Sequence, residues 1–585
     1  MLRRICEVIT LKKILKYLKG YEKQCVLGPL FKLLEATFEL FIPLVVARIV
    51  DTGISNGDTG YIVKMCLVMI LLGIIGLAMA VCAQYFSAVA AVGFSTRLRH
   101  AILQHILGLS YSQMDQLGTS TMIMRMTSDI NQVQNGVNLT LRLLLRSPFV
   151  VFGAMIMAFT IDFQAALVFA GVIPILCLIV FGIMLITMPM YKRVQASLDK
   201  VTSATRQNLA GVRVLRAFCK EEAEMKSFTE DTIELTERQL SAGRISALMN
   251  PLTFVVINLA VVLLVHTGAL KVQNGILTQG LVIALYNYMS QILVELIKMA
   301  NLIISLAKAV ACGNRLASVL EMTPSQENGT VGAEGLEGGV EFRNVTAKYA
   351  GAAHPTLENI SFKAMPGQTI GVIGGTGSGK STLVNLIPRL YDAAEGEVLL
   401  DGVAVSQYDM QSLRSRIGIV PQKAVLFRGT IRQNLLWGNE NATDRELWQA
   451  LECAQAREVV KDKTGELDAP VEQSGVNFSG GQRQRLTIAR ALVRKPRILI
   501  LDDSASALDY ATDASLRMAI RNMPDAPTTF IVSQRAASVR YADEILVLDD
   551  GQLVGRGTHE QLLESCSVYQ EIFYSQFSRE VNGNG

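Results

Sequence analysis

Charged residues are scarce in this chain of 585 residues. Asp, Glu, Lys and Arg make up 18% of it, whereas a water-soluble protein carries about 25%. Hydrophobic residues reach 50%, and the mean hydropathy is +0.32. This composition excludes a disordered chain and predicts insertion into a lipid bilayer. The formal net charge is only +4, so a nucleic-acid partner is not expected.

The chain also lacks a cysteine pattern that would mark a disulfide framework or a zinc site. Its nine cysteines are scattered and form no CxxC pair, which favours small buried thiols instead. A secretory signal is not expected either, because residues 1–23 are basic and amphipathic and have no apolar core ahead of a cleavage site. They predict a cytoplasmic interfacial helix that leads into the first membrane span.

Long uncharged runs are confined to roughly the first 320 residues. Residues 65–96 and 163–191 contain no Asp, Glu, Lys or Arg, and each run exceeds the ~20 residues that a membrane helix needs. Shorter or interrupted runs lie at about 26–50, 143–161, 245–270 and 277–302. Together these runs predict six spans.

Loop charge predicts the orientation of these spans. The segments expected outside, 51–62, Asp162 and 268–278, contain one basic residue, Lys271. The segments expected inside, 97–142 and 192–244, are rich in Lys and Arg and have helical periodicity. The positive-inside rule then places both chain ends in the cytoplasm, with the membrane helices continuing into it.

A change of composition marks a domain boundary. Residues 322–339 are rich in Gly, Pro, Ser and Glu and predict a linker. Strand-like runs follow at 340–345 and 369–373, and helical and strand patterns alternate after them. We therefore expect an interfacial helix at 1–23, a transmembrane domain at 24–321, this linker, and an α/β P-loop nucleotide-binding domain at 340–585.

The sharpest motif follows the strand-like run at 369–373 and precedes a helical run. It reads Gly374-Gly375-Thr376-Gly377-Ser378-Gly379-Lys380-Ser381-Thr382. It matches GxxxxGK[ST] in the strand-to-helix context that this motif requires. Its glycines let backbone N–H groups surround phosphates, Lys380 can reach the β- and γ-phosphates, and the Ser381 hydroxyl can bind Mg²⁺.

Two further motifs fit the same chemistry. Residues 498–502 form an apolar run that ends in Asp502, which we expect to face Mg²⁺. Between these two motifs, a second Gly-rich loop opens a helix with Ser479, Gly480, Gly481 and Gln482. For this loop alone, a helix cap with Ser479 at the N-cap is a sound alternative to an anion site.

The combination of P-loop, SGGQ and a strand ending in Asp502 resembles the ATP-binding cassette (ABC) proteins. Six spans ahead of one cassette resemble an ABC exporter half-transporter. The resemblance implies ATP and Mg²⁺ as cofactors, a head-to-tail cassette dimer, and a P-loop of one chain facing the SGGQ of the other. It also implies that Tyr349 stacks on adenine and that Gln422 senses and binds Mg²⁺ with Ser381 and Asp502.

Other positions follow from the resemblance alone. Residues 506–509 match the D-loop, and segments near 110–116 and 209–215 match the coupling helices. Three departures stand out. Asp503 occupies the position of the usual general-base Glu, Gln534 that of the usual switch His, and residues 471–475 depart from the usual V-G-E-x-G. The pattern resembles the degenerate-site subunit of a bacterial heterodimeric multidrug exporter.

Charged residues inside the predicted spans leave two interpretations open. Glu35 and Glu39 lie at i, i+4 in the first span, and Glu295 and Lys298 lie at i, i+3 in the last. They can form a polar wall of the transport path that favours cationic compounds. Alternatively they can form local ion pairs, Lys32 with Glu35 and Glu295 with Lys298.

The sequence therefore predicts an ATP-hydrolysing exporter subunit of the plasma membrane that moves drugs or other hydrophobic compounds with a non-identical half-transporter. Its own site is expected to bind ATP and hydrolyse it poorly, while its SGGQ completes the partner's site. Lipid or peptide export is an alternative. A membrane protein that uses ATP only as a regulatory ligand is another, and substrate-stimulated ATPase activity separates it from an exporter.

Overall fold

The computed structural model describes residues 14–504 and 506–577. The chain forms two compact units. Among the described residues, the first contains 14–107 together with Ser120–Met322, and the second contains Gly108–Thr119 together with 323–577. Most of the interfacial helix predicted at 1–23 lies outside the described residues. Its described part includes a short 3₁₀ helix, η1 (Lys16–Leu18).

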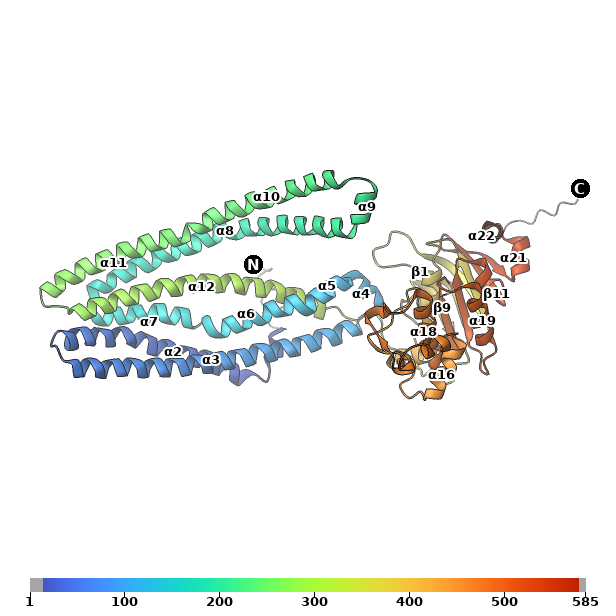
Figure 1. Ribbon diagram of the computed structural model, residues 1–585, viewed down its shortest axis with the longest axis horizontal. Helices are drawn as coiled ribbons and strands as arrows, with labels where there is room; N and C mark the ends of the chain where they lie inside the picture. Colours follow the sequence, from blue (N-terminus) through green and yellow to red (C-terminus); the bar gives the residue numbers. More distant parts are fainter. Residues whose placement is uncertain (1–13, 505, 578–585) are drawn as a thin grey trace, which may run out of the picture. The chain divides into compact units, whose positions relative to one another are not determined.

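The first unit is helical (Figure 1). Its helices are α2 (Glu22–Arg48), α3 (Thr59–Gly108), α5 (Thr119–Met124), α6 (Ile130–Leu143), α7 (Arg146–Ile161), α8 (Phe163–Ala210), α9 (Val212–Ala217), α10 (Glu221–Ala247), α11 (Met249–Gln273) and α12 (Gln279–Leu320), with π-helical turns η2 (Ile49–Ile54) and η3 (Arg125–Asp129). Helices α3 and α8 have 50 and 48 residues. Each is longer than 70 Å at about 1.5 Å per residue, well beyond the ~30 Å hydrocarbon core.

Four helical segments of the described chain are long and apolar enough to cross a membrane. They are Thr59–Gly108, Thr119–Ile161, Phe163–Ala210 and Glu221–Gln273. Helices α2 and α12 do not meet that criterion, so six spans stay a prediction. Both are long enough at 27 and 42 residues, but they carry the charged side chains of Lys32, Glu35, Glu39, Glu295 and Lys298.

Helix α12 packs along α2, α6, α7, α8 and α11. The centre of this bundle is closed by Tyr288, which is fully buried and donates a hydrogen bond from its hydroxyl to the Leu40 carbonyl at 2.6 Å. The outer faces of the long helices stay apolar and exposed. Cys66 on α3 is exposed for this reason, and Cys219 is exposed in the connection between α9 and α10. Both differ from the expectation of buried thiols, which Cys312 and Cys566 meet.

The second unit contains three β-sheets. Their strands are β1 (Val340–Ala347), β2 (Leu357–Ala364), β3 (Thr369–Gly374), β4 (Glu395–Leu400), β5 (Val403–Ala404), β6 (Ile417–Val420), β7 (Gly429–Thr430), β8 (Pro470–Val471), β9 (Ile498–Asp502), β10 (Thr528–Ser533), β11 (Glu544–Asp549) and β12 (Gln552–Gly557). The largest sheet has the order β12-β11-β3-β10-β9-β6, and it is parallel except for β12. The antiparallel sheet has the order β2-β1-β4-β5, and β7 pairs with β8.

Helices surround these sheets. They are α4 (Tyr111–Leu117), α13 (Lys380–Leu386), α14 (Met410–Ser415), α15 (Ile431–Leu436), α16 (Asp444–Cys453), α17 (Arg457–Lys461), α18 (Gly480–Val493), α19 (Tyr510–Arg521), α20 (Ala536–Val539), α21 (His559–Ser565) and α22 (Ser567–Gln576), with 3₁₀ turns η4 (Glu466–Asp468) and η5 (Gln473–Gly475). The helical membrane-type unit followed by an α/β unit confirms the predicted fold class.

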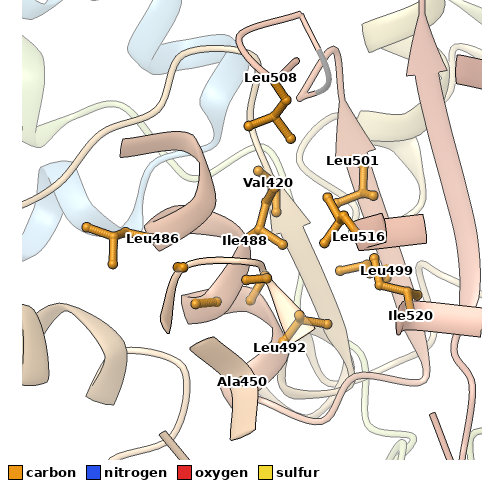
Figure 2. Packing of buried hydrophobic residues seen from close by; sticks show 14 of the residues in the cluster. Val420, Ala450, Leu486, Ile488, Leu492, Leu499, Leu501, Leu508, Leu516 and Ile520 are labelled. Carbon is orange, nitrogen blue, oxygen red and sulfur yellow. The ribbon is translucent and has the colours of Figure 1, made fainter. Parts of the chain in front are cut away.

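Both faces of the parallel sheet are buried, which explains the continuous apolar runs of its strands. Along β9, Leu499 and Leu501 pack with helices α18 and α19, as Figure 2 shows. The alternate residues Ile498 and Ile500 pack in a second core with the antiparallel sheet. Since both cores hold the strands in place, the carboxyl ends of the strands form a rigid edge.

Candidate functional site

Four parallel strands carry the predicted site residues to one edge of the sheet. Strand β3 runs into the P-loop, β9 ends at Asp502, β10 ends just before Gln534, and β6 ends just before Pro421 and Gln422. The register pairs Ser533 with Ile373 and Val532 with Asp502. Ligands of open α/β sheets bind at the carboxyl ends of the strands, so this topology brings the motifs together.

A pocket of about 230 Å³ opens at this edge. Its walls include Gln422, Asp502, Asp503 and Gln534. The P-loop contributes Thr376, Gly377, Gly379, Lys380, Ser381 and Thr382. Gly377 and Gly379 have φ values of +85° and +92°, a conformation that glycine adopts without strain. A Cβ at Gly379 would also lie 2.5 Å from the Leu357 side chain.

Lys380 lies within the P-loop itself. Its ammonium donates to the carbonyl of Gly374 at 3.0 Å and also to that of Gly375. Burial lowers the pKa of Lys380, while the nearby carboxylates of Asp503 and Asp502 oppose this shift. The ammonium is thus held over the loop, where phosphate oxygens can replace the carbonyls as its partners.

Asp502 and Ser381 offer hard oxygen ligands side by side. The Ser381 hydroxyl donates to Asp502 Oδ1 at 2.9 Å. Burial raises the pKa of the Asp502 carboxyl, with a further contribution from Asp503. A hydroxyl and a carboxylate fit Mg²⁺, which usually takes only one or two carboxylates and completes its shell with water and phosphate. The described residues contain no cluster of three or more His, Cys, Asp or Glu that could hold a metal without such help.

Asp503 is held in an unusual backbone conformation. Its φ is +45°, a region that costs energy for residues other than glycine but that Asp tolerates. Its N–H donates to the Val532 carbonyl at 3.0 Å, and its carbonyl accepts from the Ser506 hydroxyl at 2.8 Å. Its carboxylate accepts from Gln422 Nε2 at 3.3 Å. The short side chain therefore points across the pocket toward Gln422.

The backbone around Gln534 is held by a residue that sequence reasoning missed. Gln576, the last residue of α22, donates from Nε2 to the Gln534 carbonyl at 2.7 Å. Its Oε1 accepts from the Ala536 N–H at 2.9 Å. These two bonds span the exposed Gln534 and fix its place at the pocket. No local sequence pattern marks Gln576, because it lies 42 residues further along the chain.

The SGGQ loop forms the cap that the sequence left as an alternative. The Ser479 hydroxyl accepts from the Gln482 N–H at 3.3 Å, and Gln482 Oε1 accepts from the Ser479 N–H at 3.0 Å. Ser479 and Gly480 stay exposed, and a Cβ at Gly480 would meet no atom within 4 Å. None of the residues 479–482 lines the pocket of its own chain.

The adjacent motifs are also formed. Asp509 of the D-loop segment caps α19 by accepting from the Thr512 N–H at 3.2 Å. In the divergent segment 471–475, Ser474 has a φ of +60°. The segments predicted as coupling helices, 110–116 and 209–215, overlap the short helices α4 and α9.

Tyr349 lies beside the P-loop helix and has an unexpected neighbour. Its hydroxyl is 3.0 Å from Thr382 Oγ1. The ring of Tyr391 meets the Tyr349 ring edge-on, with 5.1 Å between centroids. Tyr391 in turn donates to Asp115 of α4 at 2.7 Å. Burial, followed by this bond, raises the pKa of Tyr391 and keeps it protonated as the donor.

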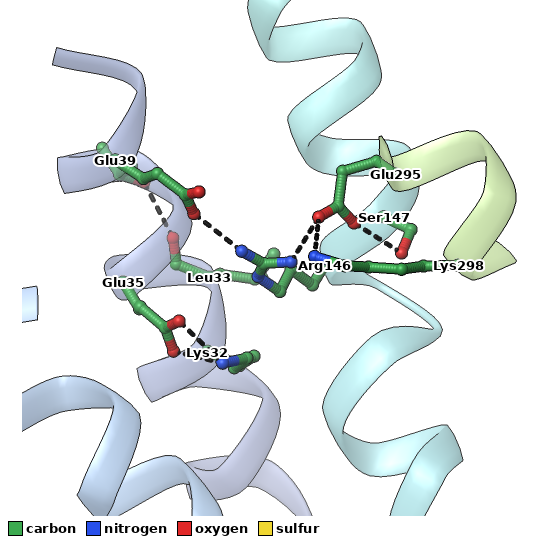
Figure 3. Close-up of polar contacts among 9 residues, drawn as sticks. Lys32, Leu33, Glu35, Glu39, Arg146, Ser147, Glu295 and Lys298 are labelled. Carbon is green, nitrogen blue, oxygen red and sulfur yellow. Dashed lines mark hydrogen bonds and ion pairs between the residues drawn. The ribbon is translucent and has the colours of Figure 1, made fainter. Parts of the chain in front are cut away.

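The charged residues of the first unit form ion pairs (Figure 3). Lys32 donates to Glu35 at 2.7 Å and Lys298 donates to Glu295 at 2.9 Å, as the local-pairing interpretation predicted. The sequence did not indicate the central member, Arg146. Figure 3 shows its guanidinium between two helices, 2.7 Å from Glu39 and 2.6 Å from Glu295. Three cations thus face three carboxylates.

Comparison with known proteins agrees with this architecture. Residues 25–296 match the family model of the ABC transporter transmembrane region, and residues 357–506 match the ABC transporter model. An uncharacterized ABC transporter ATP-binding protein of Mycobacterium tuberculosis is 38% identical, over 97% of this chain and 99% of the relative. One of Bacillus subtilis is 36% identical, with the same coverage.

A third relative has a more specific name. The ATP-dependent lipid A-core flippase of Escherichia coli is 30% identical over 94% of both chains. The cassette family implies ATP binding, usually with Mg²⁺, and its members hydrolyse ATP. Half-transporters of this architecture work as dimers in a lipid bilayer. The chain belongs to the ABC transporter family, as an exporter subunit in which one multi-pass membrane domain is fused to one ATP-binding cassette.

Proposed function

We propose that this chain is the degenerate-site half of a heterodimeric exporter in the plasma membrane, with its N-terminus and cassette in the cytoplasm. Its own P-loop binds MgATP and hydrolyses it slowly, and its SGGQ loop completes the competent site of a non-identical partner. The observation that carries this proposal is the shared pocket, in which Asp503 and Gln534 lie with Lys380, Ser381 and Asp502.

We assign a role in nucleotide binding to each of the following groups. The P-loop N–H groups and Lys380 would hold the phosphates, Ser381, Asp502 and Gln422 would hold Mg²⁺, and Tyr349 would stack on adenine. The Mg²⁺ ion would neutralise developing phosphate charge. The shared pocket of Lys380, Ser381, Asp502 and Gln422 supports binding of MgATP.

The hydrolytic half is weakened in two places. Asp503 is one methylene shorter than Glu, and a misplacement of ~1 Å can cost about 10²-fold in rate. Its carboxylate also accepts a hydrogen bond from Gln422. Gln534 can donate and accept hydrogen bonds but cannot titrate near neutral pH as His does. Both changes act on the same phosphate, which supports slow turnover at this site.

Exposed surfaces support a second chain. The SGGQ loop lies open, outside its own chain's pocket. In the first unit, α9 and its flanks expose the apolar residues Leu209, Val214 and Phe218. In the second unit, Phe427 and Trp437 stack 4.2 Å apart on the surface, and Trp437 is 61% exposed. Where such residues form a contiguous patch, they mark a site of contact with a protein or a membrane, and we assign these to the partner chain.

The ion pairs of the first unit indicate which charge on a substrate this chain would favour. Since Glu35, Glu39 and Glu295 are each neutralised within the described chain, they leave no excess negative charge that would select cations. We therefore propose hydrophobic compounds, drugs among them, as the cargo. Lipid export is the second candidate, because a relative 30% identical carries the name of an ATP-dependent lipid A-core flippase.

The test is ATPase turnover of the assembled complex, with and without a hydrophobic substrate. Ser479→Arg should abolish turnover, because its side chain fills the space where the partner's γ-phosphate meets this loop. Asp503→Ala should lower it less than tenfold, whereas loss of a working base costs about 10²–10⁴-fold. Substrate should stimulate the wild-type complex, which a purely ATP-regulated protein would not show.

A matched control keeps the result interpretable. Ser565→Arg adds an arginine at an exposed serine of the same unit and should retain most of the turnover. Loss of ATPase in Asp503→Ala, with activity intact in Ser479→Arg, would reverse the two roles and refute the degenerate-site proposal.

A further inference from the structure

An apolar cavity of about 310 Å³ lies in the first unit, outside the ion-pair network. Residues of α3, α6 and α12 line it together with the residues that precede α2, among them Leu18, Phe94, Val137 and Val310. The cavity wall is almost free of polar groups. Among the described residues that line it, the one hydroxyl, on Thr140, already donates to the Gly136 carbonyl at 2.7 Å. A site of this kind does not hold ordered water, because water needs two or more polar partners.

Small residues create this apolar cavity. Helices α6 and α12 approach so closely that a Cβ on Gly136 would lie 2.2 Å from the Cβ of Ala309. Gly136, Ala309 and Gly313 all line the cavity. The backbones meet at these residues, and the space beside them is left unfilled by side chains. The space is therefore part of the helix packing and has a fixed position.

The cavity lies at the level where three predicted spans reach one membrane boundary. Phe94 is near the end of the uncharged run 65–96, and Leu141 lies just before the span 143–161. Leu306 follows the span 277–302. In the proposed orientation this boundary is the cytoplasmic one, where headgroups of the inner leaflet meet their acyl chains.

A second, more open hollow of about 440 Å³ adjoins the cavity. Leu15 and Leu18 line both hollows, and Lys16, Lys19 and Glu22 line the second. The Glu22 carboxylate accepts from the Gly20 N–H at 2.8 Å. Lys16 and Lys19 are both exposed. Neither forms an ion pair with a carboxylate among the described residues, although the Glu22 carboxylate attracts Lys19 at longer range. The second hollow therefore has a net positive rim.

We propose that the two hollows form one binding site for an anionic phospholipid of the inner leaflet. One acyl chain fills the apolar cavity, and the phosphate lies at Lys16 and Lys19. The combination matters because a single inserted chain binds only marginally, whereas a chain together with basic residues gives stable association. The inference concerns a lipid bound to the outside of the bundle and is independent of the cargo.

The test uses the full-length protein, purified in detergent and depleted of lipid. Binding of dioleoyl phosphatidylglycerol and dioleoyl phosphatidylcholine is measured by native mass spectrometry. Each lysine near an anionic headgroup contributes about fivefold in affinity. We therefore expect phosphatidylglycerol to bind at least tenfold tighter. Lys16→Gln combined with Lys19→Gln should remove this preference, while the matched control Lys23→Gln, on an exposed lysine outside both hollows, should keep it.

A second pair of variants tests the acyl cavity. Val310→Phe should fill it and weaken the binding of both lipids about tenfold, whereas Val310→Leu should change little. Monodispersity on gel filtration and basal ATPase activity establish that the variants are folded. Equal affinity of the wild type for the two lipids, or unchanged binding by Val310→Phe, would overturn the proposal. Neither outcome bears on the degenerate ATP site, which the turnover of Ser479→Arg tests separately.

Discussion

Tyr391 donates a 2.7 Å hydrogen bond to Asp115, a residue 276 positions earlier in the chain. The same Tyr391 ring packs edge-on against Tyr349, which is predicted to stack on adenine. The Tyr349 hydroxyl lies 3.0 Å from Thr382 of the P-loop. A continuous line of side chains thus connects the nucleotide site to helix α4. Asp115 and Tyr391 both belong to the second unit, so the connection lies within one compact body.

Tyr391→Phe should uncouple α4 while leaving the nucleotide site intact. The variant keeps the aromatic ring and loses a hydrogen bond to a carboxylate, which is worth about 1.5–3 kcal/mol. We expect the ATP Kd to change less than twofold and the substrate stimulation of ATPase to fall. Tyr391→Ala also removes the ring contact, worth about 0.5–1.5 kcal/mol, and should weaken ATP binding several-fold. A fluorescent ATP analogue measures the affinity. Normal stimulation in Tyr391→Phe would contradict this role.

Glu295→Gln and Glu39→Gln each remove one of the two carboxylates that pair with Arg146. Glu295 is buried with the guanidinium, while the Glu39 side chain is 40% exposed. Loss of a buried partner leaves an uncompensated charge and costs about 3–5 kcal/mol. Loss of an exposed partner costs about 1 kcal/mol or less. The aggregation midpoint of the heated complex should therefore fall far more for Glu295→Gln. Equal midpoints would show that Arg146 does not depend on Glu295.

Neutralising Glu35 and Glu39 together tests the transport path. Because each carboxylate already faces a cation in the structure, we expect transport of cationic and neutral compounds to fall by the same factor. A selective loss for cationic compounds, measured in membrane vesicles with the complex assembled, would favour the polar-wall interpretation instead.

Single cysteines test the predicted topology. In a cysteine-free background, cysteines at Asn56 and Asn274 should react with an impermeant maleimide added to intact cells. A cysteine at Ser203 should react only after the cells are opened. All three positions are exposed in the structure, so accessibility within the fold does not limit labelling. The opposite pattern would refute the orientation with the N-terminus inside.

The surroundings of His559 predict that the stability of the cassette depends on pH. Its Nδ1 lies 2.8 Å from the Tyr569 hydroxyl. Burial, and then the positive charge of Arg540, lower the pKa of His559 below its ordinary value of 6.5. The unfolded chain then binds the proton more readily than the folded one. This contribution to stability is present above pH 6.5 and is lost as the pH falls through the folded pKa.

Tryptophan fluorescence can follow this effect in the intact protein. The chain has two tryptophans, Trp437 and Trp448, and both lie in the second unit. The thermal midpoint should fall between about pH 7.5 and pH 5.5. The fall should be smaller in His559→Gln, which keeps polar atoms at the site but cannot titrate. An identical fall in both proteins would assign the pH dependence to other groups.

Several residues of the predicted ATP site lie in one pocket, because the motifs that carry them are local in the sequence. Nine consecutive residues supply the P-loop, and the apolar run before Asp502 must end where a buried strand ends. Parallel strands have their carboxyl ends at one edge, so Lys380, Asp502 and Gln534 converge once the strands are identified.

The number of membrane spans was harder to predict from the sequence, because charged residues in α2 and α12 lower the mean hydropathy of these two helices. Those charges are acceptable only because Arg146 and other partners neutralise them in the folded bundle.

Contacts between distant segments were decided by the tertiary structure alone. Arg146 bridges Glu39 and Glu295, and Tyr391 reaches Asp115, across separations of 107, 149 and 276 residues. An isolated Arg, Tyr or Gln carries no pattern that names its partner, because hydrogen bonds depend on distance and direction in space. The order of residues determines helices, strands and loops. Which side chains meet depends on how those elements pack, and packing also leaves the cavity beside Gly136 and Ala309 unfilled.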